Sequence, residues 1–255
     1  MVDNERKKIQ AASFGSAAAL YEQARPSYPD EAVDWLLPVG ARRVLDLGAG
    51  TGKLTRALRE RGLGVVAVEP SAGMREELAR GLPEVTVLAG SAEQIPLDDG
   101  SVDAVLVAQA WHWVDPARAV PEVARVLIPG GTLGLVWNIR DERAGWVREL
   151  GELLHDGGNN PDRASASDEL SVAPVIGPPF GPVERLDVEW SKPTTPAEIA
   201  DLVASRSYII TMPPDERAAL LADLARLLAT HPDTAGQAEF PLPYVTRCSR
   251  ATLIG

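Results

Sequence analysis

The sequence predicts an α/β protein with a doubly wound, mostly parallel sheet and helices on both faces. Short runs of β-branched and other apolar residues alternate with helix-length stretches through the first half of the chain, which is the pattern of βαβ units. Turn residues such as Gly62, Pro83 and residues 129–131 separate these stretches. The apolar runs are nearly continuous, as expected for strands that helices cover on both faces.

The first half of the chain is expected to supply five strands and the helices between them. Each expected strand is a short apolar run, and most are followed by a stretch long enough for a helix. The expected strands are 44–47, 65–68, 85–88, 102–107 and 132–137, and the expected helices are 51–61, 72–80 and 117–127.

The second half is less regular, and it is expected to add two strands and a helical insertion before the last strand. A long stretch rich in Gly, Pro, Asn and Ser, residues 156–182, predicts a loop. The remaining expected elements are a helix at 146–154, a strand at 183–190, helices at 196–205 and 214–230, and a strand at 242–247. The resulting sheet has seven strands.

Composition narrows the class of protein. The 255 residues suffice for one sizeable α/β domain, and we expect a single domain over residues 1–255. No apolar run approaches the roughly 18–20 residues of a membrane span, and residues 1–10 lack the apolar stretch of a signal peptide. The single cysteine, Cys248, excludes an intrachain disulfide and a Cys-rich metal site. We therefore expect a cytoplasmic protein without a membrane anchor or a metal centre.

The charge argues against a nucleic-acid partner. The formal net charge is -11 and the pI is about 4.8, whereas nucleic acids are bound largely through clustered Lys and Arg side chains. The basic run at residues 6–8 is short. We expect a small-molecule partner instead.

The most informative stretch is the glycine-rich turn after the strand 44–47. Gly48, Gly50 and Gly52 follow Asp46 and precede a helix, so a ligand can approach the backbone and the positive end of the helix dipole. A phosphate-binding P-loop is excluded, because its first glycine and the Ser or Thr after the lysine are missing. A dinucleotide fingerprint is disfavoured, because Lys53 replaces its third glycine. The remaining pattern suits a nucleoside joined to an amino acid, and a ligand-free turn is the competing interpretation.

An acidic residue at the end of the second strand supports a nucleoside ligand. Glu69 follows the loop by about twenty residues, a spacing at which a carboxylate accepts hydrogen bonds from ribose hydroxyls. Pro70 and Met74 come next and offer apolar surface to a purine ring. A surface acid and ordinary core packing are the competing interpretations of these residues.

Four stretches taken together resemble the class I S-adenosylmethionine-dependent methyltransferases. Residues 44–52, 68–74, 90–103 and 125–133 match, in order, the family's cofactor loop, ribose and adenine segment, third-strand loop and the turn before the fifth strand. The resemblance implies a Rossmann-like sheet that binds S-adenosylmethionine and releases S-adenosylhomocysteine. Ser91 stands where the family often has an acid.

The resemblance also implies where the cofactor is bound. The expected contacts lie in the glycine loop and after the next three strands of the chain. The residues are Asp46, Gly48, Ala49, Gly50, Thr51, Gly52, Glu69, Pro70, Met74, Ser91, Ala92, Glu93, Ala108 and Gln109.

A narrower resemblance covers more of the chain. It is to a subgroup with a His-Trp pair after the fourth strand, whose relatives include trans-aconitate-type methyltransferases that esterify small carboxylic acids. The similar residues are 14–21, 25–29, 109–115, 205–208 and 242–246. This resemblance implies that residues 1–40 cover the cofactor, that residues 41–140 bind it, and that residues 141–255 cap the acceptor site.

Within that subgroup, the N-terminal segment supplies contacts to the methionine end of the cofactor. The resemblance implies that Tyr21 and Arg25 reach its carboxylate, for which the donor fork of an arginine is well matched. A solvated charge at a helix end is the competing interpretation of Arg25.

His112 is the histidine placed for acceptor chemistry, because it follows the fourth strand at the edge of the sheet where acceptors bind in this fold. A hydroxyl or amine acceptor would use it as a general base, whereas a carboxylate is already a nucleophile. A structural corner of His112 and Trp113 is the competing interpretation. Trp111 and Trp113 are candidates to line the acceptor pocket, and Arg206 and Tyr208 are candidates to recognise an anionic acid.

The expected function is methyl transfer from S-adenosylmethionine to a small-molecule acceptor, at a carboxylate or hydroxyl, by a monomer or homodimer. Two alternatives stay open. One is a NAD-dependent oxidoreductase on the same fold, and the other is a non-catalytic protein that binds S-adenosylmethionine.

Overall fold

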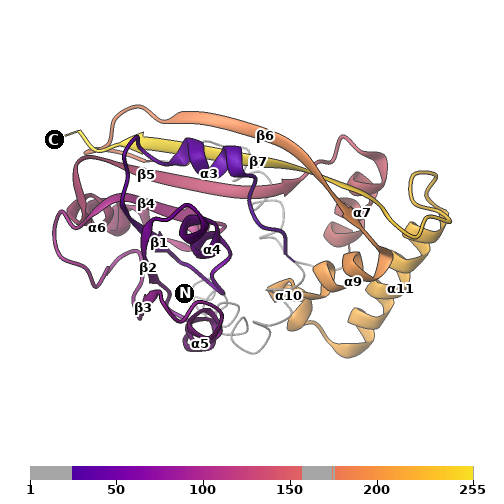
Figure 1. Ribbon diagram of the computed structural model, residues 1–255. Helices are drawn as coiled ribbons and strands as arrows, with labels where there is room; N and C mark the ends of the chain where they lie inside the picture. Colours follow the sequence, from indigo (N-terminus) through magenta and orange to yellow (C-terminus); the bar gives the residue numbers. More distant parts are fainter. Residues whose placement is uncertain (1–24, 157–173, 175, 255) are drawn as a thin grey trace. The chain divides into compact units, whose positions relative to one another are not determined.

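The computed structural model describes residues 25–156, 174 and 176–254, and its strands form a seven-stranded sheet (Figure 1). The strand order is β3-β2-β1-β4-β5-β7-β6. The strands are β1 (Arg43–Leu47), β2 (Gly64–Val68), β3 (Thr86–Leu88), β4 (Val102–Ala108), β5 (Leu127–Arg140), β6 (Glu184–Thr194) and β7 (Phe240–Thr252).

The pairing is parallel from β3 to β5 and reverses at β7. β1 pairs in parallel with β2 and β4, β2 with β3, and β4 with β5. β7 runs antiparallel to β5, because the bonds from Asp141 N to Pro243 O and from Leu253 N to Gly131 O join the two segments in opposite chain directions. The predicted seven-stranded, mostly parallel α/β fold is thereby confirmed.

The helices follow the predicted alternation. They are α3 (Asp30–Leu36), α4 (Lys53–Glu60), α5 (Ala72–Gly81), the 3-10 helix η1 (Trp111–Trp113), α6 (Pro116–Val126), α7 (Gly145–Asp156), α9 (Pro196–Ala204), α10 (Ser207–Ile210) and α11 (Pro214–Thr230). Three of them, α3, η1 and α10, are absent from the sequence prediction, because elements of this length are too short to show a helical period.

The predicted turn at residues 129–131 is wrong. These residues belong to β5, which begins at Leu127 directly after α6 instead of at residue 132. The proline and glycines form an irregularity inside the strand, where the pairing with β4 shifts between the partners Val102–Leu127 and Ala104–Thr132. Such bulges tolerate Pro and Gly within a strand. Most of the predicted loop 156–182 lies outside the described residues.

The chain divides into two compact units. The core unit comprises residues 27–138, 173–188 and 246–255, and the helical unit comprises residues 1–26, 139–172 and 189–245, each in so far as the structure describes them. The single domain expected over residues 1–255 stays a prediction.

The core unit is packed around β1 and β4. Both strands are almost completely buried, and α3 and α4 contribute Leu36, Leu54 and Leu58 to the same apolar cluster. Each such leucine contributes roughly 1.5–3 kcal/mol through burial. Arg61 also ties α3 to α4 through ion pairs with Asp30 and Asp34. Residues 30–36, predicted to belong to a segment covering the cofactor, are therefore part of this core.

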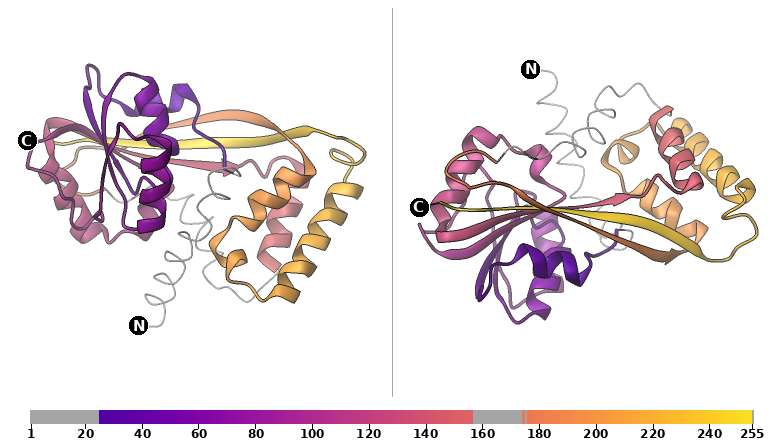
Figure 2. Two further views of the ribbon diagram at one scale, coloured as in Figure 1. Left: turned by 60° about the horizontal axis from the view of Figure 1, so that its bottom comes forward. Right: turned by 90° about the horizontal axis from the view of Figure 1, so that it is seen from above.

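The helical unit has an apolar core of its own. Figure 2 shows α7, α9 and α11 side by side, and their buried leucines and isoleucines pack together with the strand residues Phe240 and Leu242. Trp146 meets Phe240 edge to face at 5.2 Å between ring centroids. α9 begins with a capping box of Thr195 and Glu198, which satisfies two backbone N–H groups of the first turn. The helices predicted before the last strand are thus present, with α10 in addition.

None of the helices in the described parts of the chain is long and apolar enough to cross a membrane.

Candidate functional site

The glycine loop leaves β1 in a conformation that side chains oppose. Gly48 has a φ of 72° and Gly52 a φ of 94°, both in the left-handed region. A Cβ on Gly48 would lie 3.0 Å from Ala110 Cβ, and one on Gly52 would lie 2.9 Å from Leu78 Cγ. The loop is therefore held between the segment after β4 and helix α5, and α4 begins directly after it with its first N–H groups at the loop.

The side chain of Asp46, near the end of β1, is buried and bonded to helix α4 instead of being exposed to solvent. Its side chain has no exposed surface, and Thr55 Oγ1 donates a hydrogen bond to its Oδ2 at 2.5 Å. Its Oδ1 atom has no partner among the described residues. Burial raises the pKa of Asp46 to about 7, against the hydrogen bond from Thr55 and with help from the charge of Glu69. The predicted cofactor contact of Asp46 stays a prediction.

Glu69 connects the end of β2 to the glycine loop. Gly50 N donates to its Oε2 at 3.0 Å, and Ser71 N donates to its Oε1 at 2.8 Å. The side chain is 6% exposed, and burial raises its pKa even though both backbone bonds and Arg75 lower it. Each carboxylate oxygen accepts more than one hydrogen bond. The carboxylate is thus fixed at the loop with acceptor capacity left for two further hydroxyl groups.

The other residues predicted for the cofactor near this point are packed to different degrees. Ala49, Thr51 and Met74 are buried, whereas Pro70 is exposed. Met74 Sδ lies 3.8 Å from where a Cβ on Gly50 would be, so the thioether borders the loop.

The loop after β3 is folded back on itself and bonded to the segment before α6. Ser91 and Gln94 form an isolated antiparallel bridge, and Asp115 N donates to Glu93 Oε1 at 2.9 Å. Burial opposes ionisation of Glu93, but the hydrogen bonds from Asp115 and Ser91 outweigh it and lower its pKa. Glu93 thus holds two loops together. Ser91, Ala92 and Glu93 stay predicted adenine contacts.

The end of β4 carries a strained residue. Gln109 has a φ of 58°, rare for a residue with a side chain, and its N donates to Val136 O at 2.9 Å. Ala108 and Gln109 are both partly buried. β1 lies between β2 and β4 in the sheet, and ligands of doubly wound sheets bind where the strand order reverses, outside the carboxyl ends of the strands. The predicted loop, Glu69 and the end of β4 all lie at such ends.

The segment after β4 presents His112 on η1. His112 and Trp113 are exposed, with ring centroids 4.8 Å apart and an interplanar angle of 44°. Trp111 is 5% exposed, and its buried Nε1 has no partner among the described residues. Asp115 ends the segment by accepting a hydrogen bond from Ala117 N at the start of α6. Both predicted interpretations of His112, general base and structural corner, remain open with this geometry.

Residues 45–135 match a family described as a methyltransferase domain. Uncharacterized methyltransferases of Mycobacterium tuberculosis and Mycobacterium bovis are each 59% identical to this chain over 248 residues, which are 97% of this chain and 98% of the relative. An uncharacterized methyltransferase-like protein of Schizosaccharomyces pombe is 35% identical over 245 residues, which are 94% of this chain and 95% of the relative. The chain belongs to the class I methyltransferase family.

A solved structure agrees with this family. A protein of Anaeromyxobacter dehalogenans, provisionally designated a type II methyltransferase, is similar over 89% of this chain and 97% of its own, with a TM-score of 0.67 and 26% identity. The chain is thus an enzyme of the methyltransferase class. Membership in this family argues against the NAD-dependent oxidoreductase that the sequence analysis left as an alternative.

The helical unit of this methyltransferase gathers arginine and tyrosine side chains. Arg206 Nη1 donates to the Tyr208 hydroxyl at 3.3 Å, and the role of both residues in acceptor recognition stays a prediction. Arg140, at the end of β5, joins them: burial and the charge of Arg206 lower the pKa of Arg140 to about 9, against the opposite effect of Tyr244, Tyr208 and Glu142. We call Arg140, Arg206, Tyr208 and Tyr244 the arginine–tyrosine cluster.

Tyr244 shows how much positive charge collects there. It is 4% exposed and stacks on Trp190 at 5.0 Å between ring centroids. Burial raises its pKa, while the charges of Arg140, Arg25 and Arg206 all act to lower it. Arg25, predicted to reach the cofactor, therefore lies near Tyr244 in the same unit. Tyr21 lies outside the described residues.

Sequence reasoning did not single out Arg140 and Tyr244, which the structure adds to the two predicted candidates Arg206 and Tyr208. The available signal was an arginine three residues after the apolar run of the fifth strand, at the end where doubly wound sheets bind ligands. Within the described residues, no group of three or more His, Cys, Asp or Glu side chains is arranged to hold a metal ion.

Proposed function

We propose that this methyltransferase transfers a methyl group from S-adenosylmethionine to a small-molecule acceptor and releases S-adenosylhomocysteine. Family membership carries the methyl transfer, and the residues at the glycine loop support the choice of cofactor. The observation on which the proposal depends most is the carboxylate of Glu69, fixed by Gly50 N and Ser71 N at 3.0 and 2.8 Å.

The residues present fit this cofactor. A nucleoside offers two ribose hydroxyls, and Glu69 offers two oxygens with acceptor capacity left. An amino-acid moiety without a pyrophosphate suits a loop whose glycines admit close approach but whose third fingerprint position is Lys53. Met74 Sδ borders the loop as apolar surface for a purine. The cofactor's contacts with the remaining predicted residues belong to this proposal.

The cofactor supplies an electrophilic methyl group on a sulfonium, and the protein supplies alignment and exclusion of water. Glu69 would orient the ribose, and the glycine loop would hold the methionine end. His112 would accept a proton from a hydroxyl or amine acceptor. For a carboxylate acceptor, no proton needs to be removed, and His112 would have no role as a base.

The acceptor class, the subgroup and the assembly are part of the same proposal. We infer a small acid or alcohol as acceptor, in line with the resemblance to trans-aconitate-type enzymes. Location in the cytoplasm, a monomeric or homodimeric state and the absence of a nucleic-acid partner stay predictions.

The test is calorimetric titration of the full chain with S-adenosylmethionine, S-adenosylhomocysteine and, as a control, NADH. We expect micromolar binding of the two sulfur ligands and no binding of NADH. Binding of NADH alone, or of none of the three, would contradict the proposal.

A further inference from the structure

The arginine–tyrosine cluster contains a partly buried cation, Arg140, whose charge is opposed within the described protein by the nearby carboxylate of Glu142 without an ion pair. Arg140 forms no ion pair with a described residue, and its Nη1 atom is buried without a hydrogen-bond partner among them. Its neighbours along the chain behave differently: Asp141 is bonded to Arg143, and Arg143 also pairs with Glu189 at 2.8 Å. Of the acids nearest to Arg140 in the sequence, Asp141 is therefore engaged elsewhere, and the exposed Glu142 acts on Arg140 through its charge without forming an ion pair with it.

A second guanidinium, that of Arg206, places a like charge near Arg140 and disfavours its charged form. Arg206 is close enough for its charge to lower the pKa of Arg140, yet at about 9 that pKa still leaves Arg140 charged at neutral pH. Arg206 itself forms no ion pair with a described residue and donates instead to the neutral hydroxyl of Tyr208. Two like charges that share a poorly solvated site are unfavourable unless an anion joins them.

We propose that the arginine–tyrosine cluster is a binding site for the carboxylate of a small organic acid, with Arg140 as its central donor. Naming this acid as the methyl acceptor rests on the proposed function.

The chemistry of the cluster favours this ligand over other anions. A guanidinium presents parallel N–H donors that match the two oxygens of a carboxylate. Tyr244 stays protonated, since burial raises its pKa, and so it offers an O–H donor. The aromatic rings of the cluster, Tyr208 beside Arg206 and Tyr244 stacked on Trp190, suit an organic body better than an inorganic ion.

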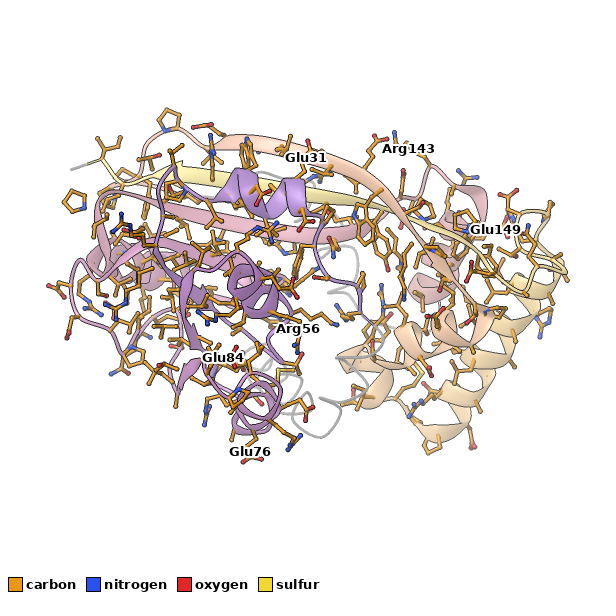
Figure 3. The ribbon with its side chains drawn as sticks, in the orientation of Figure 1. Glu31, Arg56, Glu76, Glu84, Arg143 and Glu149 are labelled. Carbon is orange, nitrogen blue, oxygen red and sulfur yellow. The ribbon has the colours of Figure 1, made fainter. Side chains whose placement is uncertain are left out.

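The experiment measures binding and needs no methyl transfer. The full chain is titrated calorimetrically with acetate, succinate, tricarballylate, benzoate and inorganic phosphate, each with and without saturating S-adenosylhomocysteine. The variants are Arg140→Met and Arg206→Met, and the matched control is Arg143→Met, an exposed arginine nearby in the chain that is labelled in Figure 3. Circular dichroism checks that each variant is folded. If Arg140→Met does not fold, the affinity of Arg206→Met for the acids tests the proposal.

We expect at least one of the four carboxylates to bind the wild type. Its affinity should fall 10-fold or more in Arg140→Met and Arg206→Met and stay unchanged in Arg143→Met. The affinity for S-adenosylhomocysteine should stay the same in all three variants.

Three outcomes would overturn the inference. One is that none of the four acids binds, or that phosphate alone does. Another is that both arginine variants keep the wild-type affinity for the acid. The third is that Arg140→Met loses S-adenosylhomocysteine in parallel with the acid, which would assign the cluster to the carboxylate of the cofactor. Failure of S-adenosylhomocysteine to bind, with acid binding intact, would instead count against the proposed function alone.

Discussion

Asp46 gives a sharp test of the physical argument for the core unit, because its carboxyl group is fully buried and only partly satisfied. It is 0% exposed, Thr55 holds one oxygen, and the other has no partner among the described residues. The pKa of about 7 is a consequence of that burial. The perturbation is Asp46→Asn, which keeps the shape of the side chain and an acceptor for Thr55 but removes the titration.

The sign and size of the effect follow from linkage. An acid whose folded pKa lies above its ordinary value of 3.8 binds its proton more tightly in the folded state. Its contribution to stability is therefore full below about pH 3.8 and is lost as the pH rises to about 7. From pH 5 to pH 8 the wild type passes through roughly two of these pH units, and at about 1.4 kcal/mol for each unit it loses about 2.5 kcal/mol.

The assay is urea unfolding of wild type and Asp46→Asn at pH 5 and pH 8. We expect the stability of the variant relative to the wild type to rise by about 2.5 kcal/mol between these two values. Asp98→Asn, at an exposed aspartate, serves as the control and should show no such change. A difference between Asp46→Asn and wild type that is the same at both pH values would refute the reasoning.

Three further predictions concern binding, stability and turnover. Glu69→Ala should weaken S-adenosylhomocysteine binding by about 1–3 kcal/mol in calorimetry, because ribose hydroxyls lose their partner; Glu76→Ala, on the exposed side of α5 (Figure 3), is the control, and equal affinity for both would remove the ribose assignment. Arg140→Met should raise the midpoint of thermal unfolding by a few degrees, because removing a partly buried charge without an ion pair among the described residues stabilises the fold by about 1 kcal/mol or more; a lower midpoint would mean that Arg140 has a structural partner. His112→Ala should lower turnover with unchanged S-adenosylhomocysteine affinity if His112 is a base; full turnover assigns it a structural role or a carboxylate acceptor.

The alternation of strands and helices and the glycine loop were predictable, because local sequence patterns determine them. Gly48 and Gly52 adopt positive φ values that glycine accepts without strain, so their spacing already indicated a tight turn at the end of a strand. A local pattern also led to the wrong prediction of a turn at residues 129–131. Pro and Gly are typical of turns, but here the antiparallel partner β7 extends the strand across them. Pairing with a distant strand is invisible to a local pattern.

The cluster around Arg140 depends on such a distant pairing. Asp141 N donates to Pro243 O, so β5 and β7 place Arg140 and Tyr244 at the same level of the sheet although they are far apart in the sequence. Glu93 shows the opposite case. Its position suggested an adenine contact, while its bond to Asp115 N serves to join two loops, and the sequence pattern does not distinguish these uses. Motifs thus located the loop and Glu69, but the cationic cluster required the fold.

Substitutions of the two arginines and of His112 together report which group of the acceptor receives the methyl group. A carboxylate acceptor is bound through guanidinium groups and needs no base, whereas a hydroxyl or amine acceptor without an acidic group needs a base and gains nothing from a pair of cations. Once an acceptor is found, the two variants therefore separate the classes. If Arg140→Met raises KM strongly and His112→Ala leaves kcat unchanged, the methylated group is a carboxylate. If Arg140→Met raises KM and His112→Ala lowers kcat with a shifted pH profile, the acid anchors the acceptor and a separate hydroxyl or amine receives the methyl group. Only the second pattern gives the exposed imidazole of His112 a chemical role, and only the absence of any KM effect would detach the arginine–tyrosine cluster from the acceptor.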